Sequence, residues 1–569
     1  MSRPELVGLV AVTAAGGTGA ARLATAWPGR TRTYPPPVGE ALARAFAECD
    51  AVVAFLATGA TVRLIAPLLA GKLRDPGVVC VDEAHRYAVA LLGGHAGGAN
   101  ALAREIADVL GVLPVVTTGS DATGITALDE LGWPVEGDVA GVARALLDGD
   151  PVHLDADSTW PLPALPATVG EHPESTYRLR VTDRIVAPAA GEVVLRPPSL
   201  VLGAGASRGV SAEEVLELLD TVLAEAGVSP ASVRHLATVE AKAEETGLQA
   251  AARARGWPLV THPADVLDHV PVPHPSQQVR AAVGTGSVAE AAAVLGGGRL
   301  LVGKRRSDRP VPQATAALAR HAPSGRLALV GLGPGARDLM TGRAHAELRR
   351  ASVVVGLDQY VDQVRDLLRP GTRVVASGLG EEEQRGRTAV ELARAGHAVA
   401  LIGSGDAGVY AMASPALLGA DEAVEVVGVP GVTAALAAAA LLGAPLGHDH
   451  AYVSLSDLHT PWTVIEGRLR AAAEGDFVVC LYNPRSHRRD WQLAAALDLL
   501  AAHRLPGTPV GVVRQASRAD QQVRLTSLAE LRATGGAGVD MSTVVIVGAS
   551  GTRTVAGRMV TPRGYRWQP

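Results

Sequence analysis

Short apolar runs alternate with amphipathic helical patterns through the first part of the chain. The runs are rich in valine and are bounded by turn or charged residues, as expected for buried parallel strands. Apolar positions at helical spacing follow them, so the order of elements predicts a doubly wound α/β domain over residues 1–150. We expect strands at residues 6–14, 49–57 and 75–83, and helices at residues 39–49 and 98–111.

The helical period is lost over residues 151–198, which we expect to be an irregular linker or a small insert domain with a few β-strands. A second α/β unit is predicted over residues 199–320, with an acidic amphipathic helix at residues 211–227. At the start of that helix, Ser211 and Glu214 have the spacing of a capping box.

The segment HAPSG at residues 321–325 predicts a domain joint, because Pro, Ser and Gly separate a helical pattern from a new strand. One more strand–helix series follows over residues 326–569. The chain is therefore predicted to be an α/β protein of several domains. The strands of this last series are RLALVGLG, ASVVVGL, TRVVASG, AVALIGSG, AVEVVGVP, DFVVCLYN, TPVGVVRQ and STVVIVGAS.

Composition supports this division and excludes several classes of function. A chain of 569 residues with 48% hydrophobic, 19% charged and 3% aromatic residues is typical of several Ala/Val-rich α/β domains. The formal net charge of -5 argues against a nucleic-acid or membrane partner, and no signal peptide or apolar spanning run is visible. Three scattered cysteines without metal spacing fit a reducing cytosol, so we expect a cytoplasmic protein.

A glycine-rich loop after the strand that begins the last series resembles the start of a dinucleotide-binding fold. Gly331, Gly333 and Ala336 match G-x-G-x-x-G/A, and Asp358 lies where such folds keep a ribose-binding acid. The pattern alone is weak, and a tight turn is its more frequent explanation. Pro334 removes a backbone donor where a pyrophosphate would bind, which disfavours NAD.

Two further segments repeat this arrangement of a buried strand that breaks at glycines before a helix. They are LIGSGDAGVYAMASPAL at residues 401–417 and VPGVTAALAAAALLGAPLG at residues 429–447. Glycine-broken strand ends in one domain predict a shared crevice at the edge of its sheet.

Together with DFVVCLYNPRSHRR, DMSTVVIVGASGTR and MVTPRGY, these motifs resemble the tetrapyrrole methylase family, in its precorrin-3B C(17)-methyltransferase branch. The resemblance covers residues 326–569. It implies subdomains of about residues 326–440 and 441–569, S-adenosylmethionine as the cofactor, a tetrapyrrole (precorrin) substrate and a homodimer through this domain. Methyl transfer to position 17 with ring contraction in cobalamin biosynthesis is the implied reaction.

The resemblance also implies a set of cofactor-binding residues, drawn from the glycine loops and from one strand end in the second subdomain. They are Gly333, Pro334, Gly335, Gly405, Asp406, Ala407, Thr433, Ala434, Tyr482 and Asn483.

Substrate and catalytic residues are expected in two polar segments of the same half. By itself YNPRSHRR would be a solvated basic turn, but the acidic rim of a precorrin favours substrate binding by Arg485, Arg488 and Arg489. In GHDH, His448 or Asp449 is the candidate base for ring contraction. Alternating residues on a strand do not form a compact ligand set, so no metal site is predicted.

The first 320 residues resemble the cobalt-precorrin-5A hydrolase family, through GATVRLIAPLLAGKLRDPGVVCVDEAHRYAVALLGGHAGGANALA, GAGASRGVSAEE and VGTGSVAEAAAV. This implies opening of a ring-A lactone with release of acetaldehyde, with His95 and Glu83 as acid–base candidates. Ala206 and Ser207 stand where the family often has Cys-Arg, which puts the activity of this part in question.

Two alternatives to these activities stay open at this stage. Residues 1–320 could be a non-catalytic corrinoid-binding module. Residues 326–569 could act on cobalt-factor III or on another methyl acceptor, such as RNA or protein.

Overall fold

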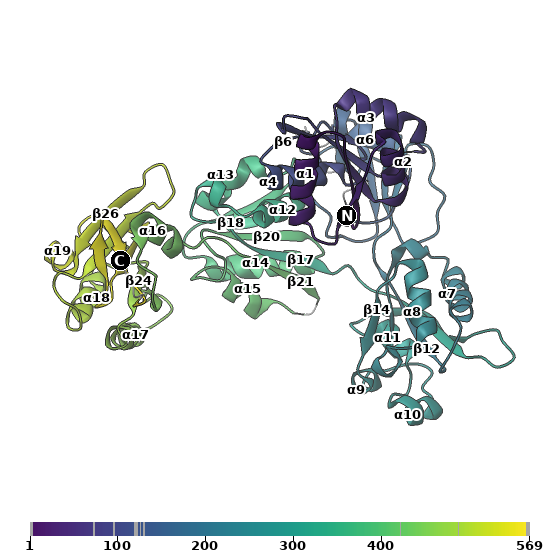
Figure 1. Cartoon of the computed structure of the whole chain (residues 1–569). Helices are drawn as coiled ribbons and strands as arrows, with labels where there is room; N and C mark the ends of the chain where they lie inside the picture. The colour runs from purple at the N-terminus through teal and green to yellow at the C-terminus, as the bar shows by residue number, and fades with distance from the viewer. Residues whose placement is uncertain are drawn as a thin grey trace. The chain divides into compact units, whose positions relative to one another are not determined.

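The computed structural model divides into two compact units, residues 1–323 and residues 324–368 with 372–569 (Figure 1). Within the described residues, no helix combines the length and the apolar character that crossing a membrane requires. The described residues are 4–71, 74–94, 97–118, 123–125, 127–128, 131–421, 423–486 and 489–564.

A six-stranded sheet of order β2-β1-β3-β4-β5-β6 begins the first unit. Its strands are parallel except that β5 runs antiparallel to β4. The apolar runs became buried strands because the helices cover them on both faces. The elements are β1(Val7–Ala11), α1(Ala14–Ala26), β2(Thr31–Tyr34), α2(Val38–Glu48), β3(Ala51–Phe55), α3(Thr58–Ile65), β4(Gly77–Val81), β5(Tyr87–Leu92), α4(Ala99–Leu110) and β6(Leu113–Val115).

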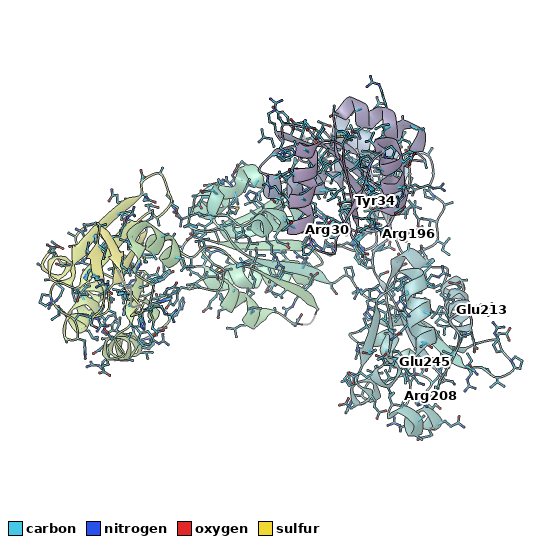
Figure 2. The ribbon with its side chains drawn as sticks, in the orientation of Figure 1. Arg30, Tyr34, Arg196, Arg208, Glu213 and Glu245 are labelled. Atoms are coloured by element: carbon cyan, nitrogen blue, oxygen red, sulfur yellow. The ribbon has the colours of Figure 1, made fainter. Side chains whose placement is uncertain are left out.

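The second sheet has the order β7-β11-β10-β8-β9 and includes most of residues 151–198. It starts upstream of that segment, at Val135. Arg196, which follows β11, binds Glu136 on β7 and so holds these two strands of the sheet together. Its side chain is almost fully buried, and its Nε donates to Glu136 Oε1 at 2.9 Å (Figure 2). The elements are β7(Val135–Gly137), α6(Val139–Asp148), β8(Val152–Ala156), β9(Val169–Gly170), β10(Tyr177–Val181) and β11(Glu192–Leu195).

The third sheet, β14-β13-β12-β16-β15, packs against α7(Ala212–Ala226) and α8(Thr246–Arg255). The predicted helix is confirmed. Of the two hydrogen bonds that a capping box requires, only the one accepted by the Ser211 side chain forms, so the predicted capping box is wrong. Ser211 Oγ accepts from the Glu214 N–H, whereas the Glu214 carboxylate accepts from Ser307 and from the Gln313 N–H. The other elements are β12(Leu200–Ala206), β13(Val233–Val239), β14(Leu259–His262), α9(Ala264–Asp268), α10(Gln277–Val283), α11(Ala289–Val294), β15(Arg299–Arg306) and β16(Ala314–Arg320).

The second unit begins with the parallel sheet β19-β18-β20-β17-β21. Helices α12 and α13 pack on one face, and α14 and α15 on the other (Figure 1). The elements are β17(Gly325–Gly331), α12(Gly342–Arg350), β18(Val353–Leu357), α13(Asp358–Val364), β19(Arg373–Ser377), α14(Glu382–Arg394), β20(Ala398–Gly403), α15(Ala413–Gly419) and β21(Val424–Val429).

Helix α16(Ala434–Leu442) leads from this sheet to a mixed sheet of order β23-β24-β27-β25-β26. Parallel strands β23 and β24 turn one face toward α16, and α17, α18 and α19 cover the other. The elements are β22(Gly443–Ala444), β23(His450–Ser454), α17(Trp462–Glu474), β24(Val478–Tyr482), α18(Gln492–Ala501), β25(Pro509–Arg514), β26(Gln522–Ser527), α19(Leu528–Ala533), β27(Thr543–Val547), β28(Arg553–Val555) and β29(Arg558–Val560).

Candidate functional site

Three loops meet at the carboxyl edge of the parallel sheet in the second unit, where β20, β17 and β21 lie side by side. The loops after β17 and β20 form a two-way backbone bridge. Gly333 N–H donates to Gly405 O at 3.0 Å, and Gly405 N–H donates to Gly333 O at 2.7 Å. A Cβ at Gly431 would lie 2.1 Å from Gly405 O, so only glycine lets the third loop approach this bridge.

Asp406 ties the β20 loop to the β21 loop. One carboxylate oxygen accepts the Gly408 N–H at 2.8 Å, and the other accepts the Gly431 N–H at 3.0 Å. Ala407 beside it is buried. Asp406 therefore fixes the loop geometry, and its negative charge sits at the centre of the crevice edge.

Tyr482, at the end of β24, connects the second subdomain to this edge. Its phenolic oxygen accepts the Ala435 N–H at 2.9 Å and lies in a 2.7 Å hydrogen bond with the Thr433 hydroxyl. Thr433 and Ala434 form the start of α16, so the phenol occupies the position of a helix cap. The predicted cofactor residues of both subdomains are thus brought together in one unit.

A cluster of tyrosine rings surrounds this junction. The rings of Tyr410 and Tyr452 each pack against that of Tyr482 in a tilted arrangement, with ring centroids 5.3 and 5.6 Å apart, and the Tyr410 hydroxyl donates to Tyr452 O at 2.7 Å. Burial raises the pKa of all three phenols, that of Tyr452 to about 12. The cluster stays uncharged near neutral pH and presents apolar ring faces beside the crevice.

Backbone strain concentrates in the same loops. Seven non-glycine residues among those described have positive φ, and four lie here: Tyr410 (φ 51), Asn483 (φ 49), Gln515 (φ 53) and Ser517 (φ 62). Conformations of this kind persist only where surrounding contacts hold them, and they gather at functional sites. Asn483 is held by its Nδ2 donating to Ser454 Oγ at 3.0 Å.

The two described arginines of YNPRSHRR bind their own chain. Arg489 is buried, and its guanidinium donates to Asn483 O at 3.1 Å and to Ser456 Oγ at 3.0 Å. Arg485 donates to Gly535 O at 2.8 Å. They brace the loop after β24. Arg488 lies outside the described residues, and substrate binding by these arginines stays a prediction.

His448 and Asp449 are not brought to the crevice edge. They precede β23, whereas Ser454 at its other end pairs with Tyr482. The intervening strand spans about 13 Å at roughly 3.3 Å per residue. Their side chains are 49% and 77% exposed, and the Asp449 N–H donates to His448 Nδ1 at 2.8 Å. A catalytic role for this pair stays a prediction without support from its position.

The arrangement of strands disfavours the dinucleotide interpretation of GLGPG. In a dinucleotide fold the ribose-binding acid ends the strand beside the glycine loop. Here Asp358 follows β18, which is separated from β17 by β20. Only one 3₁₀ turn, Arg337–Leu339, follows the glycines directly, and helix α12 starts at Gly342, so no α-helix begins at the glycines to receive a pyrophosphate at its N-terminus.

In the first unit, Glu83 lies at the carboxyl edge of the six-stranded sheet. Chain order reverses between β1 and β3, which is where such sheets place ligand crevices. The Thr13 hydroxyl, just after β1, donates to Glu83 Oε1. His95, the other acid–base candidate here, lies outside the described residues.

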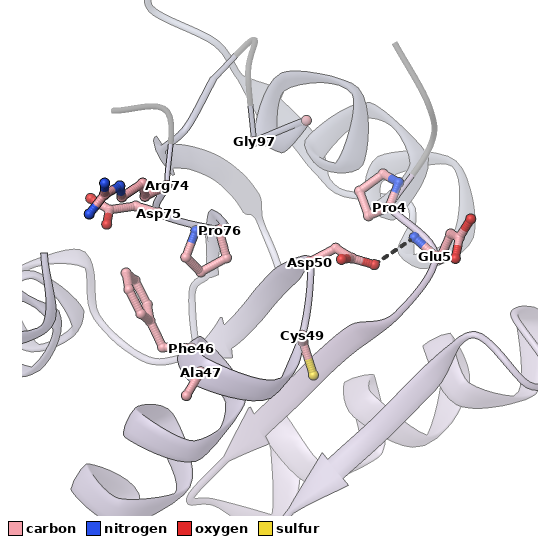
Figure 3. Close-up of a pocket in the computed structure, with 11 residues that line it drawn as sticks. Pro4, Glu5, Phe46, Ala47, Cys49, Asp50, Arg74, Asp75, Pro76 and Gly97 are labelled. Carbon is pink, nitrogen blue, oxygen red and sulfur yellow. Dashed lines mark hydrogen bonds between the residues drawn. The ribbon is translucent and has the colours of Figure 1, made fainter. Parts of the chain in front are cut away.

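The cavity in Figure 3 lies at the opposite, amino edge of that sheet. It encloses about 430 Å³ and is lined by Glu5, Asp50 and Pro76, which precede β1, β3 and β4. Asp50 Oδ2 accepts the Glu5 N–H at 3.0 Å, as the dashed line marks. Glu83, the predicted acid–base residue that the structure describes, does not line this cavity, so the cavity is separate from the position of that residue.

Comparisons with known proteins agree with this geometry. Residues 326–532 match the family described as Tetrapyrrole (Corrin/Porphyrin) Methylases. The chain is 48% identical over 242 residues to a probable cobalt-factor III C(17)-methyltransferase of Salmonella typhimurium, covering 42% of this chain and 99% of that protein. The chain belongs to the tetrapyrrole methylase family. It is an enzyme of the methyltransferase class, as predicted from the motifs.

This tetrapyrrole methylase is also similar to two further proteins. A precorrin-3B C(17)-methyltransferase of a Sinorhizobium species is 41% identical over 253 residues, covering 42% of this chain and 98% of that protein. The crystal structure of the methyltransferase CobJ is 38% identical and covers 42% of this chain and all of that one, with a TM-score of 0.40.

The first unit matches two further families. Residues 40–121 match Cobalamin synthesis G N-terminal, and residues 200–319 match Cobalamin synthesis G C-terminus. The predicted joining of a tetrapyrrole methylase to this second type of cobalamin-synthesis protein is therefore confirmed.

Sequence reasoning missed several residues of the crevice, above all Arg518. Its Nε donates to Pro334 O at 2.9 Å, and its Nη2 donates to Ser404 Oγ at 3.3 Å. The available signal was the polar segment RQASR directly after a buried strand. Tyr410 and Tyr452 were also missed, because a single tyrosine in a loop or strand usually indicates only packing.

Proposed function

We propose that residues 324–569 transfer a methyl group from S-adenosylmethionine to position 17 of precorrin-3B and contract the macrocycle. The proposal rests on one observation above all: three glycine loops and the end of β24 are tied into one crevice edge within the part that resembles C(17)-methyltransferases. When bound, S-adenosylmethionine supplies an electrophilic methyl group on a cationic sulfonium.

The residues of the crevice suit a cofactor of that charge. Asp406 supplies a negative charge beside the backbone bridge between Gly333 and Gly405. The other residues that would hold the cofactor are Gly333, Pro334, Gly335, Gly405, Ala407, Thr433, Ala434, Tyr482 and Asn483. Their part in the reaction is orientation and exclusion of water, which can lower a barrier by about 7–11 kcal/mol.

The test is methyl transfer by the full chain, with the product identified by mass spectrometry. Wild-type protein should add one methyl group to precorrin-3B, and Asp406→Asn should lose most of that activity because its amide group would face an N–H donor. Asp421→Asn, an exposed ion-pair change, is the matched control. If Asp406→Asn transfers methyl at the wild-type rate, Asp406 is not part of the site.

A second substrate is favoured by the Salmonella relative, whose name specifies cobalt-factor III. Metal-free precorrin-3B and cobalt-factor III should therefore be compared as acceptors under the same conditions. Faster methylation of the cobalt compound would place the protein on a route in which cobalt enters first. Methylation of RNA or protein in place of both would contradict the proposal.

For the first unit we propose hydrolysis of the ring-A lactone of cobalt-precorrin-5A with release of acetaldehyde. Glu83 at the sheet's carboxyl edge supports it, together with the match to Cobalamin synthesis G. Glu83→Gln in the full chain should abolish acetaldehyde release, while the exposed Glu213→Gln should not. If wild-type protein binds the lactone without releasing aldehyde, this unit is a corrinoid-binding module.

We also propose that the chain forms a homodimer through its methylase unit. Leu417 and Leu418 on α15 are 52% and 87% exposed, and Leu436 on α16 is 50% exposed. Adjacent exposed leucines such as Leu417 and Leu418 could form part of an apolar contact with a second copy of the chain. Light scattering should give twice the mass of the 58.2 kDa chain, and a monomer would contradict the proposal.

A further inference from the structure

Arg518 reaches from the second subdomain to two of the three glycine loops. It follows β25, and its guanidinium donates to Pro334 O at 2.9 Å, to Ser404 Oγ at 3.3 Å and to Gln515 Oε1 at 3.3 Å. Its side chain passes over Gly335, where a Cβ would lie 2.6 Å from Arg518 Cγ. The charged group therefore lies at the meeting point of the loops after β17 and β20.

No described carboxylate forms an ion pair with Arg518, although many arginines of this unit have one. Arg326 binds Glu347, and Arg514, four residues before Arg518, binds Asp540. All three partners of Arg518 are uncharged, and two of the distances are long for bonds from a guanidinium. The group also has more N–H donors than these contacts use. A half-buried cation with neutral partners is suited to an anion that arrives with a ligand.

The loop that carries Arg518 is held firmly in a strained conformation. Gln515 and Ser517 both have positive φ, and the loop is closed by Ser517 N–H donating to Gln521 Oε1 at 2.8 Å. Gln515 N–H donates to Ser542 O at 2.9 Å, in a turn that Asp540 shapes. Strain that is maintained by several contacts fixes the guanidinium in place before any ligand binds.

We propose that Arg518 binds a carboxylate of the ligands that occupy the crevice and so positions them for methyl transfer. The inference rests on the proposed methyltransferase function and assigns a role that the motif comparison does not. Two sources offer this chemistry: the amino-acid carboxylate of the cofactor, and the acetate and propionate groups of the macrocycle. The planar guanidinium can bind either one through paired N–H donors while Nε keeps its bond to Pro334.

Calorimetry on the full chain can separate the two sources. The probes are S-adenosylhomocysteine, which carries the carboxylate, and methylthioadenosine, which lacks it. The variants are Arg518→Gln, Arg518→Lys and, as the matched control, Arg524→Gln, whose guanidinium is exposed on β26 and bonds only the Ala537 carbonyl among the described residues. The KM for the tetrapyrrole and kcat are measured on the same proteins.

If Arg518 binds the cofactor, Arg518→Gln weakens S-adenosylhomocysteine about 10- to 100-fold and leaves methylthioadenosine unchanged. If it binds the macrocycle, the affinity for S-adenosylhomocysteine is unchanged and the KM for the tetrapyrrole rises by a similar factor. In either case Arg518→Lys should retain part of the binding, because the charge remains without the planar fork. Arg524→Gln should behave as wild type.

Two results would overturn the inference. One is an Arg518→Gln protein whose ligand affinities and KM both stay within about twofold of wild type. The other is an equal loss of affinity for methylthioadenosine and S-adenosylhomocysteine, which is the mark of a purely structural residue. The proposed function has its own test in the same experiment: it is wrong if the wild-type protein binds neither S-adenosylhomocysteine nor methylthioadenosine. In that case the role inferred for Arg518 is wrong as well.

Discussion

The hydroxyl of Thr433 and the phenolic oxygen of Tyr482 lie 2.7 Å apart, and this pair joins the start of α16 to the end of β24. The same phenol accepts the Ala435 N–H. An otherwise unsatisfied helix N-terminus is thus capped by a side chain from a strand 49 residues away in the sequence.

Tyr482→Phe should therefore destabilise the second unit while preserving its aromatic stacking. A buried N–H left without a partner costs about 1–3 kcal/mol of unfolding free energy. Urea unfolding measures the change. Tyr452→Phe is the control, because the Tyr452 hydroxyl forms no hydrogen bond with the residues that the structure describes. Equal stability of Tyr482→Phe and wild type would show that the phenol does not cap α16.

Gly335→Ala should disturb the crevice by two independent effects. The residue has φ +141, which a side chain rarely adopts, and an added Cβ would lie 2.6 Å from Arg518 Cγ. We expect a loss of about 1–3 kcal/mol of unfolding free energy and a large fall in methyl transfer, measured by urea unfolding and product mass spectrometry. Gly342→Ala, where no atom lies within 4 Å of the added Cβ, should change neither.

The sequence predicted the central strands of the six-stranded sheet and of the parallel sheet in the second unit well, because parallel strands are buried on both faces. The run AVALIGSG, for example, contains β20(Ala398–Gly403), and all six residues of that strand are buried. In the third sheet the central strands β13 and β16 were missed, and the helical pattern expected just before HAPSG is wrong, because that segment is β16. The edge strand β26(Gln522–Ser527) was missed, since none of its residues is buried and no apolar run marks it. Patterning therefore predicts a strand that carries a long apolar run better than an exposed strand such as β26.

Long-range contacts set the limit on predicting the site. Glu214 had the correct spacing for a capping box, but Ser307 and Gln313, 93 and 99 residues later, bind its carboxylate instead. Arg518 likewise depends on Pro334, which is 184 residues earlier. The family motifs identified the glycine loops, whereas a residue defined only by what it meets in space leaves no local pattern.

Asp540 should make the stability of the second unit depend on pH in the acid range. Burial acts to raise its pKa, but bonds from Ser542, Arg514 and Thr543 outweigh it and lower the pKa to about 2. A carboxyl group whose folded pKa lies below its ordinary value of 3.8 stabilises the fold above that pH, and the contribution is lost as pH falls toward 2. Because the side chain is 44% exposed, we expect only about 1 kcal/mol.

The test compares Asp540→Asn with wild type in urea at several pH values. Their difference in unfolding free energy should be constant above about pH 4 and should shrink toward pH 2. Asp498→Asn, an exposed ion-pair change on α18, serves as the control. A difference that does not vary with pH would mean that the Asp540 carboxylate is not selectively stabilised by the fold.

His235 should give the first unit a pH dependence in a higher range. Burial, with smaller effects of Arg234, His262 and His321, lowers its pKa from 6.5 to about 4. The unfolded chain takes up a proton below about pH 6.5 while the folded chain does not, so stability falls between those two pH values. A shift of this size corresponds to about 3 kcal/mol of unfolding free energy at the acid end of that range.

His235→Gln should remove that part of the slope of stability against pH, as measured by hydrogen exchange of the peptide that covers β13(Val233–Val239). Burial also lowers the pKa of His262 and His321, so some slope should remain. His345→Gln, on α12 of the other unit, should leave the exchange of this peptide as in wild type. An unchanged slope in His235→Gln would show that this histidine is protonated equally in the folded and unfolded states.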